Sequence, residues 1–468
     1  MERPISRRAL LGATVAAGLG VAVTGTVATL YNSGPPPAGP GGRTVSPKGA
    51  GYGPLVRDPA GRLALPQGFR YQVLAEEGVT RLESGEFSPS DPDGAAAFPA
   101  PDGNGVVLVS NHEIGNSEPH PVPLIEGFVY DPAGRGGTTT IEVAPDGSRV
   151  RQYVSLAGTY KNCAGGRTPW NTWLSCEETE RVLEKPHGYI FEVDPHDQEA
   201  NRDPRPIKAL GRFPHEAVVV DPETFVMYET EDARRPNGGF YRFTPPADAL
   251  PLGKGSLRRL ADDAGTLEAL RATTADGRHI RDLAEVTEIG TVLRTEWVEV
   301  PERDAERTSV RRQFGDDEVT RGRKLEGAWW ADDGAYVVSS YARAKDGEAT
   351  NHGGQVWYLD PREQTLTLYL RFAAVDDAGQ ANDAADGPDN ITVSPYGGVL
   401  IAEDGRGRPH LLGATPGGEV FFLAQSEPEV KGSEFCGPVF SPDQRLLFTN
   451  LQGPGLTFTI QGPFAQGT

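Results

Sequence analysis

Long helical periodicities are scarce in this sequence. Glycine and proline are abundant instead, with 58 Gly and 40 Pro among 468 residues. Such a composition is typical of many short strands joined by many turns, and it predicts an all-β chain. The length is large for one domain, but β-propellers and barrels routinely exceed the usual size as a single unit, so we expect one domain.

Positive charge is also in short supply. Lys and Arg number 45 against 65 Asp and Glu, which gives a formal net charge of −20. An acidic surface repels phosphate backbones and anionic lipid, and this argues against a nucleic-acid partner. An anionic substrate would have to be met by locally placed cations or metals.

Acidic residues are absent from the first thirty positions after Glu2. Arg7 and Arg8 lie within Ser6-Arg7-Arg8-Ala9-Leu10-Leu11 and precede an apolar stretch that extends to Leu30. This pattern predicts a twin-arginine signal peptide over residues 1–31, with the twin-arginine translocase as the partner for export. That route carries folded proteins, often with a cofactor already inserted, and therefore favours a metal or cofactor protein.

The segment after the signal is rich in Pro and Gly, and we expect a flexible linker over residues 32–50 and one β-propeller domain over residues 51–468. An N-terminal membrane anchor is the alternative to a signal peptide, because the cleavage signal is weak and the apolar run is long. Both readings place the folded domain outside the cytoplasm, as a periplasmic, cell-surface or extracellular protein.

Cysteine is rare as well, with Cys163, Cys176 and Cys436 as the three thiols. An odd number leaves at least one unpaired in an oxidising compartment, and an unpaired thiol there requires a reason. We expect Cys176 and Cys436 to be small buried residues, as most free cysteines are.

A repeated pattern of polar opener, apolar strand, turn and second apolar strand indicates a propeller. The second strand recurs in six stretches, which predict a six-bladed β-propeller: Val106 to Glu113, Thr172 to Glu178, Phe225 to Asp232, Ala335 to Ala342, Gly398 to Gly405 and Leu446 to Gly453. Closure of the ring by pairing of Gly455–Pro463 with an N-terminal strand at Phe69–Ala75 is a further expectation.

The repeat spacing doubles between blades, over residues of about 249–324. Ser256 to Leu270 and Ile280 to Val286 are strongly charged and have a helical or irregular pattern. We therefore predict a mostly irregular or helical insertion that covers one face of the propeller.

Potential metal ligands recur at equivalent places in the repeats. The polar residue that opens a repeat lies about one strand pair before a second polar residue. These pairs are Cys163 and Glu178, Glu216 and Asp232, Asp389 and Glu403, and Glu434 and Asn450, whereas Glu326 is alone in its repeat. Because innermost strands run along the central channel of a propeller, these positions should converge at one mouth. Clustered carboxylates repel each other unless cations neutralise them, and this predicts bound metal. Oxygen-rich sets suit calcium, whereas a thiolate with carboxylates suits iron.

Histidines and arginines flank these positions. His112 and His215 directly precede acids and are candidate ligands, proton donors or packed histidines. We favour a role in which they contact the metal ligands and do not bind the metal themselves. Arg234, Arg235 and Arg343 follow strand ends, where an arginine could bind a phosphate group or form a surface ion pair.

Five ordered motifs together resemble the PhoX-type alkaline phosphatases, from about Pro66 onward. They are Asn162–Glu178, Gly211–Pro222, Lys324–Trp330, Asp386–Gly405 and Glu434–Pro463. The resemblance implies a six-bladed propeller, exported by the twin-arginine route, that hydrolyses small phosphate monoesters at a cluster of ferric iron and calcium.

The residues carried over from the family are these. Cys163 resembles the iron-ligating thiolate, with Glu216 and Glu326 as the carboxylates nearest the iron, and these three are the implied catalytic residues. Glu178, Asp232 and Asp389 resemble the acids shared with calcium, with Asn390 and Asp404 beside them. The fourth repeat departs from the pattern, because Ser339-Ser340-Tyr341-Ala342 holds no acid.

Two other functions fit a propeller of this composition. A calcium-dependent lactonase-type hydrolase would use fewer acids and no thiolate. A non-catalytic propeller that binds a partner or a structural ion is the other alternative. No protein partner beyond the translocase is evident from the sequence.

Overall fold

The computed structural model describes residues 51–343, 345, 347–375, 384–405, 407–430 and 434–466. Contacts divide the chain into two units, Met1–Asn32 and Ser33–Thr468, and all described residues belong to the second. The predicted signal peptide over residues 1–31 and linker over residues 32–50 lie outside the described residues. Within the described part, no helix is long and apolar enough to cross a membrane.

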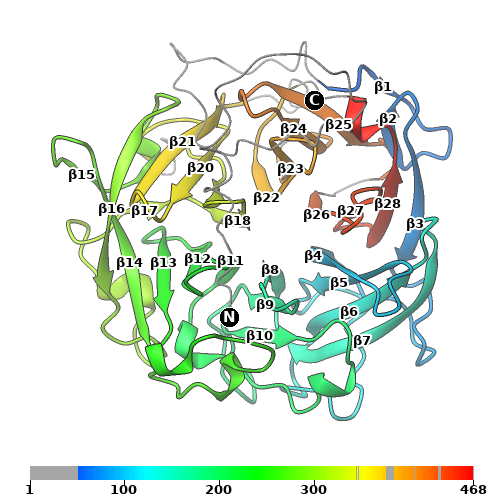
Figure 1. Ribbon diagram of the computed structural model, residues 1–468, viewed down its shortest axis with the longest axis horizontal. Coiled ribbons are helices and arrows are strands. Elements are labelled where there is room, and N and C mark those ends of the chain that lie inside the picture. The colour runs from blue at the N-terminus through cyan, green and yellow to red at the C-terminus, as the bar shows by residue number, and fades with distance from the viewer. Residues whose placement is uncertain are drawn as a thin grey trace, which may run out of the picture. The chain divides into compact units, whose positions relative to one another are not determined.

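The described chain has an all-β, propeller-like fold. The strands that lie nearest the centre in Figure 1 each begin a series of neighbouring antiparallel strands. These inner strands are β4 (Pro92–Pro99), β8 (Asn162–Arg167), β11 (His215–Val220), β18 (Leu325–Trp330), β22 (Pro388–Val393) and β26 (Phe435–Phe440).

The second strand of each series falls in one of the stretches identified from the sequence, which confirms the repeat. These strands are β5 (Val106–His112), β9 (Trp173–Glu177), β12 (Met227–Glu231), β19 (Ala335–Ser339), β23 (Val399–Glu403) and β27 (Leu447–Leu451). The outer strands are β6 (Gly136–Val143), β7 (Arg149–Thr159), β10 (Ile190–Val193), β13 (Gly238–Thr244), β14 (Thr266–Thr273), β20 (Gly354–Asp360), β21 (Thr365–Phe372), β24 (His410–Ala414), β25 (Val420–Ser426) and β28 (Leu456–Gln461).

The number of separate blades stays a prediction. The described strands form five sheets, because β16 (Val292–Glu299) pairs with both β14 and β21 and thereby joins two series into one 11-stranded sheet. Short strands β15 (His279–Ile280) and β17 (Arg321–Gly322) pair at its side.

N-terminal strands complete two C-terminal sheets. Strand β3 (Arg70–Glu76) pairs with β28, so the predicted closure of the ring is confirmed. Strands β1 (Leu55–Val56) and β2 (Leu63–Pro66) extend the sheet of β25. These pairings satisfy backbone groups that would otherwise be exposed at sheet edges.

The apolar core lies between neighbouring sheets. One cluster joins Phe98 and Val107 of the first series to Trp173 and Phe191 of the next, all of them buried. This packing follows from the period of two in each strand, since alternate side chains face the adjacent sheet.

For Ser256 to Leu270, the expectation of a helical or irregular structure is wrong from Thr266 onward. Only Leu257–Arg259 forms a single turn of 3-10 helix (η5), and Thr266–Thr273 is strand β14, paired with β13 and β16 on its two sides. Pairing on both sides outweighs a helical charge pattern, and Glu268 bonds Arg242 across the strands at 2.6 Å.

The other helical turns among the described residues are equally short. They are η2 (Glu199–Asn201), η3 (Lys208–Leu210), η4 (Ala247–Ala249), η6 (Leu283–Glu285), η7 (Val310–Gln313) and η9 (Phe464–Gln466). The predicted insertion of residues 249–324 is therefore a mixture of strands and 3-10 turns.

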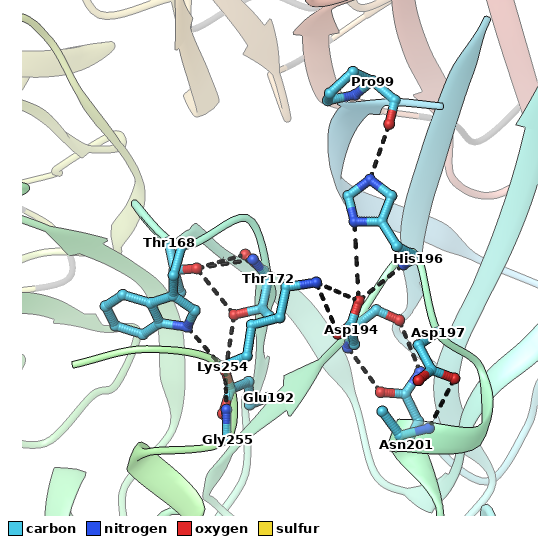
Figure 2. A network of polar contacts seen from close by, with 12 residues as sticks. Pro99, Thr168, Thr172, Glu192, Asp194, His196, Asp197, Asn201, Lys254 and Gly255 are labelled. Atoms are coloured by element: carbon cyan, nitrogen blue, oxygen red, sulfur yellow. Dashed lines mark hydrogen bonds and ion pairs between the residues drawn. The ribbon is translucent and has the colours of Figure 1, made fainter. Parts of the chain in front are cut away.

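Polar contacts fix the start of this insertion to the sheet of β10. Figure 2 shows Lys254 bonded to both carboxylate oxygens of Asp194, at 3.0 and 2.9 Å, and the amide of Gly255 bonded to Glu192 at 3.1 Å. Glu192 also accepts hydrogen bonds from Trp170 and Thr172. The start of the insertion thus packs beside the outer strand β10 of this sheet.

Candidate metal centre

A β-bulge recurs near the start of every inner strand. In β4, β8, β11, β18 and β22, the register shifts between the first and fourth residues, which leaves the second residue in the bulge. A bulge re-aims side chains at such positions. The five bulge residues, called here the bulge ring, are Asp93, Cys163, Glu216, Glu326 and Asp389.

The sixth inner strand has no ligand at this position. In β26 the register shifts between Cys436 and Val439, which places Gly437 in the bulge. Gly437 has a φ of 56°, and a Cβ there would lie 2.4 Å from the carbonyl oxygen of Asp93. Glu434, just before β26, contributes a carboxylate instead.

Close approach of the bulges explains the small residues that follow the ring positions. A Cβ on Gly94 would lie 2.5 Å from Cα of Ala164, and one on Gly327 would lie 2.7 Å from Cα of Asn390. The backbones of neighbouring inner strands therefore touch, and this contact holds the ring side chains together.

A second tier of acids follows the second strands. Glu113, Glu178, Asp232 and Asp404, called here the rim acids, come directly after β5, β9, β12 and β23. The amide of Glu178 donates to the carbonyl of Lys161 at 2.8 Å, and that of Asp404 donates to Gly387 at 2.8 Å. The corresponding residue of the fourth series is Ser340, so that position has no acid, as the sequence indicated.

Among the described residues, three groups of possible ligand atoms form from the two tiers and Glu434. Within each group the atoms lie within 4.8 Å of one another: Asp93, Glu113 and Cys163; Glu216, Glu326 and Asp389; and Asp389, Asp404 and Glu434. Cys163 also connects the first two groups, because its Sγ lies 3.1 Å from Oε1 of Glu216 and 3.5 Å from Oδ2 of Asp93.

Of the eight predicted ligands, five enter these groups, namely Cys163, Glu216, Glu326, Asp389 and Asp404. Glu178 bonds Lys161 instead. The amide of Asn390 donates to Asp389 at 2.8 Å and accepts from the amide of Gly437 at 2.7 Å, which positions Asp389. Asp232 lies in the rim, and its Oδ1 is buried without a hydrogen-bond partner among the described residues.

Sequence reasoning missed Asp93 and Glu113 as ligand candidates, and it named Glu434 as a repeat opener without carrying it into the implied ligand set. A signal for Asp93 was present, because Asp93-Gly94 has the same acid-then-small pattern as Glu216-Ala217 and Glu326-Gly327. Asp-Gly is also a strong signal for a hairpin turn, so the dipeptide alone does not identify a ligand.

Two residues that the sequence pattern paired with openers have structural roles. Glu403 accepts from Nδ1 and the backbone amide of His410, at 2.6 and 2.7 Å. Asn450 donates to the carbonyl of Asp93 at 2.6 Å. These contacts brace the strands behind the ligand atoms.

Burial raises the pKa of the ring carboxyls. The pKa values of Asp93, Glu216, Glu326 and Asp389 lie well above their ordinary range because the groups are buried, and neighbouring acids raise them further. Glu434 and Glu178 are shifted upward for the same reasons. Burial likewise raises the pKa of the Cys163 thiol. So many buried acids are stable as anions only if cations neutralise them.

Lysines supply part of that charge. Nζ of Lys324 lies 2.8 Å from Oε1 of Glu326 and 3.2 Å from Oδ2 of Asp404. Burial alone would lower the pKa of Lys324, but attraction to Glu326 and Asp404 raises it well above the usual value. Lys161 bridges two rim acids in a similar way.

Two cavities lie near the candidate ligands. The space between the inner strands is about 20 Å³, lined mainly by small residues with Trp173 and Trp329, which is room for about one water. On the rim side, a pocket of about 490 Å³ is bordered by Asp404, Glu434, Gln452 and Arg408. A small anion could reach the third acid group from this pocket.

A family model described as alkaline phosphatase PhoX matches residues 50–455. The chain belongs to the PhoX alkaline phosphatase family. The resemblance drawn from the five motifs is thereby confirmed, and membership supports a phosphatase. No curated protein matches the chain.

Solved structures similar to this PhoX chain are distant from it. A gluconolactonase from Xanthomonas campestris is 14% identical, with a TM-score of 0.40, over 91% of this chain and 98% of that one. A Trichoderma reesei carbohydrate-active enzyme of family AA12 is 11% identical, with a TM-score of 0.39, over 87% and 99%. The β-propeller domain of Cps50 (Swd1) from Myceliophteria thermophila is 11% identical, with a TM-score of 0.38, over 84% and 99%.

The residues of this PhoX chain fit a metal centre. The donor set combines a thiol with carboxylates, and Oδ1 of Asp93 and of Asp232 are both buried without a hydrogen-bond partner among the described residues. An orphaned buried carboxylate oxygen is costly, and a cation would satisfy it.

The two histidines next to candidate ligands in the sequence contact other residues of the fold. The ring of His112 lies 2.8 Å from the carbonyl of Ser90 and 2.9 Å from Oγ1 of Thr139. His215 lies 3.2 Å from Glu229 through Nδ1 and 3.2 Å from the carbonyl of Gly211 through Nε2. Both histidines therefore hold the strands that carry the candidate ligands. Of the predicted arginines, Arg234 and Arg235 are exposed, and Arg343 covers the ring of Tyr341.

Proposed function

We propose that this chain is an exported, six-bladed propeller phosphatase that hydrolyses small phosphate monoesters at iron and calcium ions. The main support is the convergence of one thiol and several buried carboxylates from different inner strands, in a chain of a phosphatase family. Lactone hydrolysis would not need a thiolate among the ligands.

The two ion types are assigned by ligand chemistry. Cys163, Glu216, Glu326 and Asp389 would hold ferric iron, since thiolate and dense carboxylates suit that ion. Asp389, Asp404 and Glu434 offer only oxygen and would hold calcium. Glu178, Asp232 and Asn390 border these groups. Cys163, Glu216 and Glu326 are the proposed catalytic residues, through their contact with iron.

When bound, the ions would polarise the phosphoryl group as Lewis acids and activate the attacking water. The protein's own contribution is orientation and charge. Lys324 lies between the second and third acid groups, where its ammonium can donate to a phosphate oxygen. The small residues and Trp329 beyond the ring confine the substrate to the rim side.

Export remains part of the proposal. Residues 1–31 would direct the chain to the twin-arginine translocase, and residues 32–50 would connect the signal to the propeller. Folding before export would allow the ions to be inserted in the cytoplasm.

The deciding experiment is elemental analysis of protein purified through its native export route, combined with assays on p-nitrophenyl phosphate and gluconolactone. We expect iron and calcium together, phosphatase activity, and loss of that activity when a chelator removes the ions. A metal-free protein with full phosphatase activity would contradict the proposal. Lactone hydrolysis without phosphatase activity and without iron would support the lactonase alternative.

A further inference from the structure

A lysine lies between two rim acids of neighbouring sheets. Nζ of Lys161 is 2.6 Å from Oε1 of Glu113 and 3.1 Å from Oε2 of Glu178. The Lys161 side chain is 38% exposed, so this ammonium lies at the mouth of the site. Glu113 follows β5 and Glu178 follows β9. The two ion pairs of Lys161 therefore connect the first two strand series.

The backbone fixes the position of this lysine. The amide of Lys161 donates to the carbonyl of Ile114 at 3.1 Å, and its carbonyl accepts from the amide of Glu178 at 2.8 Å. Its φ of 53° is in the left-handed region, which costs a non-glycine residue about 1 kcal/mol. The segments that carry the two carboxylates thus also hold the lysine between them.

The second oxygen of Glu113 is also occupied by a protein donor. Nε2 of Gln452 lies 2.7 Å from Oε2 of Glu113 and 2.9 Å from Oδ2 of Asp93. Glu113 therefore has an N–H donor on each oxygen. Glu178 does not enter any of the groups whose ligand atoms lie within 4.8 Å of one another among the described residues.

We propose that Lys161 is a built-in cation that takes the position a divalent ion would otherwise hold between Glu113 and Glu178. The inference rests on the proposed function, because it concerns how many ions the acids hold. An ammonium at hydrogen-bond distance occupies oxygens that calcium would need at about 2.4 Å, and it repels a second cation. Glu178 enters no group of three possible ligands among the described residues, whereas Glu326 and Asp404, which Lys324 contacts, each have two other acids of such a group to share an ion with. The ions are then confined to the ring residues and to the third acid group, and Glu178 is neutralised by Lys161.

Lys161→Met tests this arrangement by removing the ammonium while keeping most of the aliphatic side chain. Wild type and variant are loaded with excess calcium, freed of loose ions by desalting, and compared by elemental analysis. We expect the variant to bind about one more calcium per chain. Its thermal midpoint should also fall further than that of the wild type in chelator and recover with added calcium, because two acids then depend on that ion.

Three further variants control the experiment. Lys161→Arg keeps the charge and should keep the wild-type ion count, and Lys161→Gln repeats the test if the Met variant does not fold. Lys254→Met removes a lysine that bonds the carboxylate of Asp194, next to the outer strand β10 (Figure 2). The number of ions bound by this variant should equal that of the wild type. Equal calcium counts in metal-loaded wild type and in both neutral variants would overturn the inference. A wild type that binds no iron or calcium would overturn the proposed function instead.

Discussion

Sγ of Cys163 lies 3.1 Å from Oε1 of Glu216, although the residues belong to different inner strands. Each occupies the bulge of its strand, β8 or β11, and each is followed by a small residue that lets the backbones approach. The contact shows how the fold brings these residues together: equivalent bulges meet around one axis, and their side chains become neighbouring candidate ligands.

Cys163→Ser should abolish iron binding and reduce phosphatase activity by a factor of about 100 or more, since an alcohol is a poor substitute for a thiolate ligand. Iron per chain and kcat on p-nitrophenyl phosphate check this. Cys176→Ala is the control, because Cys176 is fully buried in an apolar cluster outside the ring and its loss should change stability alone. A serine variant with wild-type iron content would show that Cys163 is not a ligand.

Glu403 and Asp404 are adjacent, yet their substitutions should have opposite consequences. Glu403→Ala leaves the buried His410 without its carboxylate partner and should destabilise the fold by about 2 to 4 kcal/mol. Asp404→Asn removes a proposed calcium ligand at the rim and should lower calcium affinity with little change in metal-free stability. Urea unfolding in chelator and calcium titration separate the two. The reverse result would mean that Glu403 is the ligand.

Gly437→Ala should destabilise the protein by about 3 kcal/mol or more, because its Cβ would overlap the carbonyl of Asp93 and its φ is positive. Gly103 also has a positive φ, of 72°, but has open space around it. Gly103→Ala should therefore cost only about 1 kcal/mol, for the backbone alone. Comparing the urea midpoints of the two variants separates the cost of the steric clash at Gly437 from the cost of a positive φ. Equal losses of stability would contradict the close approach of the bulges.

Asp282 provides a pH-dependent test at a residue outside the candidate ligand groups. Burial raises its pKa to about 6, and Glu348 adds to the shift, whereas the amides of Ala284 and Asn237 oppose it. A raised pKa in the folded state means that stability is fully present below the unfolded value and is lost as pH rises through about 6.

Asp282→Asn should remove this loss of folding stability with rising pH, while keeping a side chain that can cap η6. The melting temperature of the variant should exceed that of the wild type by an amount that grows between pH 4 and about pH 7. Scanning calorimetry across this range measures the difference. A constant difference would show that Asp282 does not titrate as described.

Strand pattern and composition were enough to predict the all-β propeller-like fold, the second strands and the closure by β28 and β3. These features depend on local alternation of apolar residues, which sequence shows directly. Residues 266–270 were expected to be helical or irregular because the segment is strongly charged, whereas pairing of β14 with β13 and β16 makes them a strand.

The sequence by itself determined that carboxylates and one thiol recur at the openings of the repeats and need cations. Tertiary structure decided which of them meet. It placed Asp93 and Glu113 among the ligand candidates, turned Glu403 inward to His410, and set Lys161 between Glu113 and Glu178. These choices depend on bulge register and on contacts between segments far apart in the chain, such as Gln452 with Asp93. Local periodicity carries no information about them, because they arise only when the sheets close around a common axis.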